Sequence, residues 1–148
     1  MMMDHPLLIT TMLNRARKLF PKKEIFSRCL DRDHRLNYGQ FYERVCRLAN
    51  VMTSLGIKPG DRVGSFAWNN HRHLELYFAV PCIGAVLHTI NLRLFPEQLV
   101  HVINHAADRV IFIDEDLVPL LARIADQLTT VEKYIILSDK EELPEINL

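Results

Sequence analysis

The stretch "RVGSFAW" (residues 62–68) is the first of four apolar, β-branched segments in this chain of 148 residues. It follows the turn sequence Lys58-Pro59-Gly60, in which proline fixes φ and glycine allows a positive φ. The other three segments are "VLHTIN" (86–91), "RVIFID" (109–114) and "KYIILS" (133–138). They recur about every 24 residues, and this spacing is typical of β-α-β crossover units. We therefore predict an α/β fold with a mainly parallel sheet, whose near-continuous apolar strands are covered on both faces.

A second, smaller sheet is predicted near the N-terminus. The segments "EIFSRCL" and "RLNY" flank the polar loop "DRDH" and form a candidate antiparallel hairpin. The chain contains neither a low-complexity tract nor a linker between domains. Its length is that of a single domain.

Helical periodicity fills the intervals between the predicted strands. From Gly39 to Leu55 the apolar residues form one stripe, and Asn37 with Gln40 resembles a capping box that starts this helix. Gly56 supplies the residue with positive φ that ends it. A second helix opens at Pro96 and carries Leu99, Val102, Ile103 and Ala106, and a third spans Leu117 to Leu128.

One further helix covers the apolar stretch that follows residue 70. Pro81 lies inside this stretch, and a proline at that position is expected to kink the helix or to end it near Val80.

Charge and hydropathy exclude several classes of protein. Eighteen basic residues balance eighteen acidic ones, which gives no general electrostatic reason to bind nucleic acid. The segment "RARKLFPKK" (15–23) is the one candidate basic patch, although a solvated helix end has the same composition. The longest apolar run, Leu76 to Leu87, is interrupted by Pro81 and Gly84, so no transmembrane segment is expected.

Cysteine usage and the N-terminal sequence favour a cytoplasmic protein. Cys29, Cys46 and Cys82 are widely spaced, which suggests reduced and partly buried thiols. The first twenty residues lack the pattern of a secretory signal, because Asp4 precedes any basic residue and the apolar stretch is short.

The segment "NNHRHLELYF" (69–78) contains the first candidate catalytic or metal-binding group. His71 and His73 are two residues apart and point about 200° away from each other on a helix, so both cannot easily reach one metal ion. Asn69-Asn70 is a natural start for a helix, and Glu75 is expected in its first turn, where it suits the helix dipole. The helix start is the favoured interpretation.

His101 and His105 form a second candidate pair. They have the spacing of the zinc motif His-Glu-x-x-His, but the glutamate that acts as general base is absent. Both lie opposite Leu99, Ile103 and Ala106 on the predicted helix, which indicates a solvated or interdomain face.

Nucleotide-binding loops are not apparent in the sequence. Such loops need closely spaced glycines, and the chain has neither a Gly-x-Gly nor a Gly-x-Ser-x-Gly sequence. Ligands of open parallel sheets bind beyond the carboxyl ends of the strands, which points to Asn69, Asn91 and Asp114. Ordinary turn and capping roles are the alternative for each of the three.

Three segments together resemble a known family: "LGIKPGDRVGSFAWN", "HLELYFAVPCIGAVLHTINLRLFPEQLVHVINHA" and "DRVIFID". They look like the N-terminal region of adenylate-forming acyl-CoA synthetases, and are most similar to bacterial medium- and long-chain fatty-acid:CoA ligases. The resemblance covers roughly residues 8 to 140, and the order of the segments is its specific feature. Phe95 departs from the pattern, since the family usually has Ser or Thr before the proline, and the helix start is weakened by about 1 kcal/mol.

The resemblance implies a function for a longer parent protein. Members of the family join a fatty acid to CoA through an acyl-adenylate, with ATP and Mg as cofactors, and some related synthetases form homodimers. The segments that perform this chemistry lie later in the family's chain and do not occur here, so no catalytic, cofactor-binding or metal-binding residue is assigned. Residues 1–148 are expected to be one fragment of the large N-terminal domain, inactive alone, with the catalytic part and the C-terminal domain absent.

Two other hypotheses remain open on the sequence alone. The chain could be a free-standing α/β binding or assembly module that uses the strand-end residues Asn69 and Asn91 or the His101/His105 face. A small metal hydrolase is the third hypothesis, and it predicts stoichiometric bound zinc.

Overall fold

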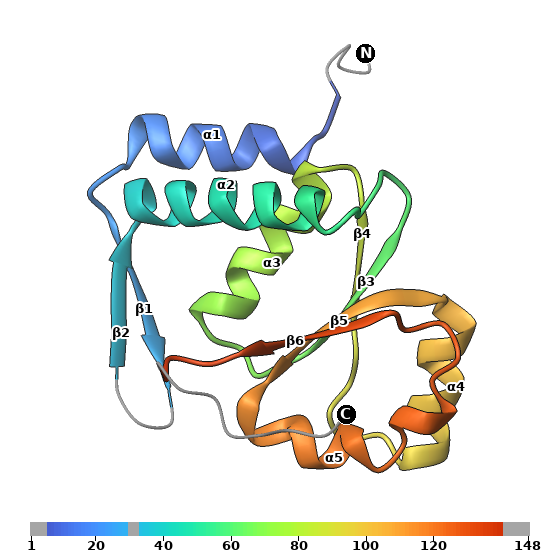
Figure 1. Ribbon diagram of the computed structural model, residues 1–148. Helices are drawn as coiled ribbons and strands as arrows, with labels where there is room; N and C mark the ends of the chain where they lie inside the picture. The colour runs from blue at the N-terminus through green and yellow to red at the C-terminus, as the bar shows by residue number, and fades with distance from the viewer. Residues whose placement is uncertain (1–5, 30–32, 141–148) are drawn as a thin grey trace, which may run out of the picture.

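A four-stranded parallel sheet forms the centre of the computed structural model, which describes residues 6–29 and 33–140 (Figure 1). The strands are β3 (Arg62–Phe66), β4 (Val86–Thr89), β5 (Asp108–Asp114) and β6 (Lys133–Leu137). Their order across the sheet is β4-β3-β5-β6, and each neighbouring pair is parallel. The parallel α/β architecture predicted from the spacing is confirmed.

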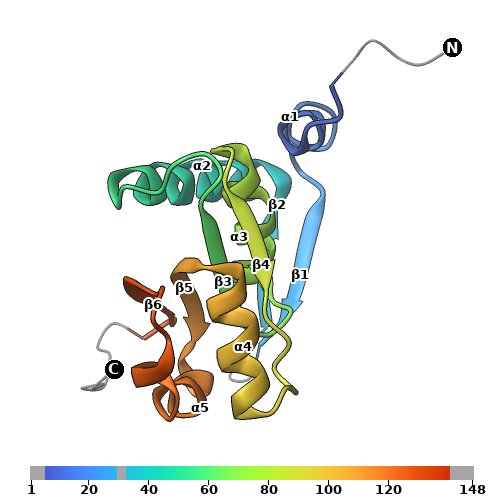
Figure 2. The same ribbon diagram turned by 90° about the vertical axis from the view of Figure 1, so that its right-hand side faces the viewer.

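Two apolar cores lie on opposite faces of this sheet. Alternate side chains of β5 enter different cores: Val110 and Phe112 pack with α2 (Tyr38–Ser54) and α3 (His71–Cys82). Ile111 and Ile113 pack with α4 (Pro96–Ala106) and α5 (Val118–Ala122). Figures 1 and 2 show α1 (Ile9–Leu19) and α2 at one end of the molecule and α4 and α5 at the other.

Burial of the strands depends on their position in the sheet. The central strands β3 and β5 are buried along almost their whole length, as the apolar runs predict. The outer strands β4 and β6 are only half-buried, because each has a neighbour on one side within the described part of the chain.

The predicted hairpin is also present. Strands β1 (Glu24–Arg28) and β2 (Asp33–Asn37) pair in antiparallel register, with Ile25 opposite Leu36. Residues 30–32 lie outside the described residues, as does most of the polar tail, residues 141–148. They include the first half of the loop predicted at 31–34, whereas its second half, Asp33 and His34, belongs to β2.

Local sequence signals set the ends of α2. The Asn37 side chain accepts the Gln40 amide and the Gln40 side chain accepts the Asn37 amide, both at 2.9 Å, so the predicted capping box is confirmed. Gly56, with a φ of 83°, follows the end of the helix, and Gly60, with a φ of 86°, completes the turn into β3.

Proline decides the end of α3 and the start of α5. Helix α3 passes through Pro81 and ends one residue later at Cys82, so the structure shows termination near the predicted position. The single helix expected from Leu117 to Leu128 is wrong. Two 3₁₀ turns (Glu115–Leu117 and Ala125–Gln127) flank the short α5, in which Pro119 occupies the first turn, where a missing N–H is tolerated.

A tertiary contact supports the break after α5. The Asn104 side chain on α4 donates to the Gln127 carbonyl at 2.9 Å and accepts the Thr129 amide at 3.0 Å. These bonds give partners to backbone groups of the irregular segment that leads to β6. Among the described residues, none of the helices is both long and apolar enough to cross a bilayer.

Candidate functional site

A hollow of about 790 Å³ opens at the carboxyl ends of the parallel strands. Its wall includes Trp68 after β3, Asp114 at the end of β5 and Ser138 after β6. The chain passes from β4, on one side of β3, to β5 on the other side, so the junction between β3 and β5 is the topological switch point. Open α/β sheets bind ligands at this position, which makes the hollow the first candidate site in the described part of the chain.

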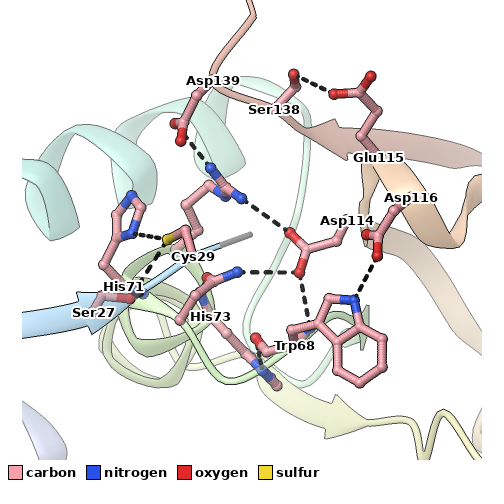
Figure 3. Close-up of polar contacts among 12 residues, drawn as sticks. Ser27, Cys29, Trp68, His71, His73, Asp114, Glu115, Asp116, Ser138 and Asp139 are labelled. Atoms are coloured by element: carbon pink, nitrogen blue, oxygen red, sulfur yellow. Dashed lines mark hydrogen bonds and ion pairs between the residues drawn. The ribbon is translucent and has the colours of Figure 1, made fainter. Parts of the chain in front are cut away.

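Asp114 connects the end of β5 to the turn between β3 and α3 (Figure 3). Its Oδ2 accepts hydrogen bonds from the Trp68 amide at 2.8 Å and from the Asn70 side chain at 3.1 Å. Burial raises the pKa of Asp114, while the bond from the Trp68 amide and the charge of Arg72 oppose that rise. The carboxylate therefore acts as the anchor for the loop that presents Trp68.

Arg72 links the same carboxylate to the segment that follows β6. Its guanidinium lies 3.5 Å from Asp114 Oδ1 and 2.8 Å from Asp139 Oδ1. Arg72 and Asp114 are both mostly buried, so their contact is shielded from solvent, whereas the Asp139 side chain is partly exposed. Arg72 thus ties together the ends of β5 and β6 at the floor of the hollow.

Several other polar groups of the hollow pair with one another. The Trp68 indole N–H donates to Asp116 at 2.8 Å, the Ser138 hydroxyl donates to Glu115 at 2.8 Å, and Lys140 pairs with Glu115. Trp68 itself is 48% exposed. The arrangement offers an aromatic face and mutually paired charges, which suits binding.

His71 and His73 begin α3, as the sequence predicts. Asn70 caps the helix by accepting the His73 amide at 3.1 Å. The His71 ring stacks on His34 at 3.8 Å, and its Nδ1 lies 3.8 Å from the Cys29 sulfur. These contacts anchor the start of the helix against the hairpin.

The His73 ring contacts a different part of the molecule. Its Nε2 lies 3.0 Å from the Ser65 hydroxyl and its Nδ1 lies 3.2 Å from the Trp68 carbonyl. Donation from Nδ1–H to the carbonyl leaves Nε2 to accept the serine proton. The two histidines therefore stabilise separate junctions and do not converge on one site.

Burial makes both histidines poor proton acceptors at neutral pH. It lowers the pKa of His71 to about 4, and the nearby positive charges of His34, when protonated, and of Arg72 add to this shift. Burial also lowers the pKa of His73, although the Trp68 carbonyl opposes the change. Both rings are neutral at pH 7, so neither donates a proton there as a general acid.

The position expected for Glu75 is wrong. It lies beyond the first turn of α3, is buried, and pairs with Arg44 of α2 at 2.5 Å. A buried carboxylate needs such a partner more than it needs the helix dipole, because desolvation of an unpaired charge is costly.

The other sequence candidates occupy separate places. His101 and His105 are exposed on α4 with ring centroids 5.7 Å apart, as expected of a solvated or interdomain face. Asn91 caps its own turn by accepting the Arg93 amide at 3.0 Å, while Asn69 is exposed at a smaller hollow next to β1. Of the three strand-end candidates, only Asp114 lines the main hollow.

Thiols and possible metal ligands are scattered through the fold. All three cysteines are free and half-buried, as their spacing predicts. Within residues 6–29 and 33–140, no three His, Cys, Asp or Glu side chains are grouped so that they could hold a metal ion.

Sequence reasoning missed most residues of the hollow, notably Trp68, Arg72, Asp116 and Asp139. Trp68 is the last residue of a predicted strand, and the other three stand one to four residues beyond one, so closeness to a strand end was a usable signal. Their convergence depends on the strand order, which the repeat alone does not determine.

Comparison with known proteins places the chain in a family. Residues 13–147 match the family described as AMP-binding enzyme. The chain is 46% identical over 142 residues to a 3-methylmercaptopropionyl-CoA ligase of Ruegeria lacuscaerulensis, and 43% identical over 140 residues to a long-chain-fatty-acid–CoA ligase of Thermus thermophilus. These matches cover 95% and 94% of the chain, which spans only 26% of each relative's length.

Solved structures agree with this assignment. A fatty acyl CoA synthetase of Mycobacterium tuberculosis superposes with a TM-score of 0.77 at 27% identity, over 88% of this chain and 26% of that one. The N-terminal domain of FACL13 from the same organism superposes with a TM-score of 0.82 at 24% identity, over 97% of this chain and 39% of that one, and shows the same fold. The fold and the sequence matches together show that this chain belongs to the family of AMP-binding enzymes and corresponds to the N-terminal part of its acyl-CoA ligases.

Proposed function

We propose that residues 1–148 are a structural piece of the large N-terminal domain of an ATP-dependent fatty-acid:CoA ligase, and that the piece alone is inactive. In the parent protein, ATP and a carboxylate give an acyl-adenylate and pyrophosphate, and the thiol of CoA then displaces AMP. The observation that carries the proposal is the 43% identity to a long-chain-fatty-acid–CoA ligase, of which the chain spans about a quarter.

The chemistry of the hollow supports a scaffold role. ATP, Mg and CoA are the expected cofactors of the parent, but the residues around the hollow do not fit a triphosphate. Asp114, Glu115 and Asp116 contribute carboxylates, and Arg72 is already paired with acidic partners. No step of the reaction is therefore assigned to side chains of this chain.

The cellular setting of the parent forms part of the same proposal. We place it in the cytoplasm, and the three free cysteines support a reducing compartment. Its partners are a fatty acid, ATP and CoA, and a homodimer formed through this region is expected.

Expression of the full-length parent tests the ligase assignment. Pyrophosphate release should depend on the added acid, and CoA should then give the acyl-CoA product. The acids compared are short-, medium- and long-chain fatty acids and 3-methylmercaptopropionate, because relatives of both kinds resemble the chain. A parent that releases no pyrophosphate with any of them would refute the assignment.

The isolated 148-residue chain tests the scaffold role in the same assay. It should form neither acyl-adenylate nor acyl-CoA. Turnover by this chain alone would show that a catalytic centre exists within it.

A free-standing binding module is the second candidate, and the hollow at the switch point favours it. Thermal unfolding of the chain with ATP, CoA or fatty acids separates the two proposals. A melting temperature that rises with ligand concentration supports the module, and an unchanged one supports the scaffold.

A further inference from the structure

We propose that His101 and His105 on α4 form a surface site for one divalent transition-metal ion of the class of Zn²⁺, Ni²⁺ and Cu²⁺. The two residues lie outside the hollow at the strand ends, and the site is independent of the ligase function proposed above. Figure 1 shows α4 at the right-hand edge of the molecule, and in Figure 2, seen from that side, the helix lies at the front.

The distance between the two imidazole rings is close to the value that one ion requires. Their centroids lie 5.7 Å apart. Zinc holds imidazole nitrogens at about 2.0–2.1 Å, and at a tetrahedral angle this bond length places two ring centres about 5 Å apart. The rings lie within 15° of parallel, so each has to turn about its Cβ–Cγ bond to point a nitrogen at the ion. Side-chain rotation is therefore sufficient, because residues four apart already lie on one face of a helix.

Both imidazoles are open to an incoming ion. His101 and His105 are exposed, and among the described residues neither ring forms a hydrogen bond or an ion pair. By contrast, His71, His73 and His88 each have a ring nitrogen in contact with another side chain. The nitrogens of the pair on α4 are therefore available as metal ligands.

The helix that carries the pair is held in place by the rest of the fold. Leu99 and Ile103 are buried and anchor the opposite face of α4. The Asn104 side chain binds the backbone at Gln127 and Thr129, which fixes the end of the helix. Binding of an ion therefore does not have to order a helix, a cost that weakens binding to short flexible peptides.

The ligand set selects the class of ion. Neutral imidazole nitrogens suit zinc, nickel and copper, whereas Mg²⁺ and Ca²⁺ require oxygen ligands. In residues 6–29 and 33–140, no three His, Cys, Asp or Glu side chains are grouped to hold a metal ion, so water completes the coordination of this one. Val102 follows His101 where the zinc motif His-Glu-x-x-His has glutamate, so the pair lacks the general base of that motif.

The position on the helix adds a smaller electrostatic contribution. His105 lies in the last turn of α4, where the negative end of the helix dipole favours a cation. Arg62 donates to the Ala106 carbonyl at 2.6 Å and compensates part of that charge. The two imidazoles therefore supply most of the affinity.

Isothermal titration calorimetry of the 148-residue chain with Ni²⁺ tests the proposal. One equivalent of Ni²⁺ should bind, Zn²⁺ should compete for the same site, and Mg²⁺ should not bind. Because the two imidazoles face one ion only when α4 is folded, Ni²⁺ should also raise the melting temperature of the chain, and EDTA should reverse the rise. Neither measurement involves ATP, CoA or fatty acid, so the outcome does not depend on the ligase assignment.

Four variants locate the ion. His101→Asn and His105→Asn should each weaken Ni²⁺ binding by about tenfold or more, because a single imidazole remains. Adding Glu97→His to the His105→Asn variant again places two exposed histidines four residues apart, one turn earlier on the helix, and should recover most of the lost affinity. The control His34→Asn removes a histidine of β2 and should bind Ni²⁺ like the unmodified chain.

Three results would overturn the proposal: no binding of Ni²⁺ to the unmodified chain, binding that His101→Asn and His105→Asn leave unchanged, or no recovery when Glu97→His is added. Loss of binding in His34→Asn would place the ion at the hairpin and would also overturn it. The substituted side chains on α4 are exposed, so without metal each of these variants should melt close to the temperature of the unmodified chain.

Discussion

The imidazole of His88, on the outer strand β4, lies 2.6 Å from the carboxylate of Asp108, at the start of β5. Strand β3 runs between them, and Gly64 is its residue paired with His88. Asp108 is completely buried, and burial raises its pKa against the opposing hydrogen bond from His88. A β carbon on Gly64 would stand 3.3 Å from the bonded carboxylate oxygen and 3.0 Å from Cγ1 of Ile111. The absence of a side chain at Gly64 therefore makes room for a buried polar pair.

Gly64→Ala is expected to destabilise the fold. The added methyl group must push Ile111, Ile90 or the Asp108 carboxylate, and such overpacking costs about 1–3 kcal/mol. Urea unfolding should show a lower midpoint, while the dependence of the unfolding free energy on urea concentration stays unchanged. A midpoint equal to that of the unmodified chain would mean that the neighbouring side chains relax freely.

Acidification should destabilise the chain through His71. Its pKa falls from 6.5 to about 4 on folding, so between these values the unfolded state binds a proton that the folded state does not. The free energy of unfolding that depends on His71 is fully present above pH 6.5. It decreases as the pH falls toward 4, by about 3 kcal/mol in total. Urea unfolding measured at intervals from pH 7 to pH 4 gives the dependence of the free energy of unfolding on pH.

A variant without the buried imidazole isolates this effect. His71→Asn should flatten the fall in stability between those pH values, whereas His101→Asn, which removes an exposed histidine, should leave it steep. If the free energy of unfolding depended on pH equally in the two variants, groups other than His71 would cause the dependence.

Asp114→Ala should loosen the loop that carries Trp68. The change removes the acceptor of the Trp68 amide and the partner of Arg72, and loss of one member of a buried pair costs about 3–5 kcal/mol. Trp68 is the single tryptophan of the chain, so its fluorescence reports directly on this loop. A shift of its emission to longer wavelength is expected under native conditions.

Asp116→Ala is the matched control for that experiment. It removes only the exposed bond to the indole N–H and should cost less than about 1 kcal/mol. Comparable losses of stability in the two variants would argue against Asp114 as the anchor of the Trp68 loop.

The pair Arg44–Glu75 should show strong coupling in a double-mutant cycle. Arg44→Leu leaves a buried carboxylate unpaired, so the single variant should be less stable than the double variant with Glu75→Leu. The coupling free energy is expected at about 1–3 kcal/mol. The exposed pair Glu43–Arg47 on the same helix, 3.9 Å apart, should give below about 0.5 kcal/mol.

Features that depend on neighbouring residues were predictable from the sequence. The capping box of Asn37 and Gln40, the glycines at 56 and 60 and the spacing of the strands all follow from local rules. The single helix expected from Leu117 to Leu128 is instead a short α5 between two 3₁₀ turns, and Asn104, distant in sequence, binds backbone groups at Gln127 and Thr129 in the segment that follows.

The candidate site was predictable only in part. The rule of strand ends identified Asp114, but the partners of Asp114 depend on which strands are adjacent. The same limit applies to Glu75, which was expected in the first turn of α3, because the approach of Arg44 could not be predicted from the sequence. Long-range pairing of charges is a property of the assembled sheet and helices.

The adjacency of β3 and β5 has a consequence for biosynthesis. These two central strands pair directly, although β4 and two helices separate them in the chain. On the ribosome, β3 emerges long before β5, so its apolar residues have no partner on that side until the segment through Asp114 has been made. Non-local pairing of this kind slows folding and prolongs the exposure of the first strand, and a chaperone that binds extended apolar segments would find its target at residues 62–66.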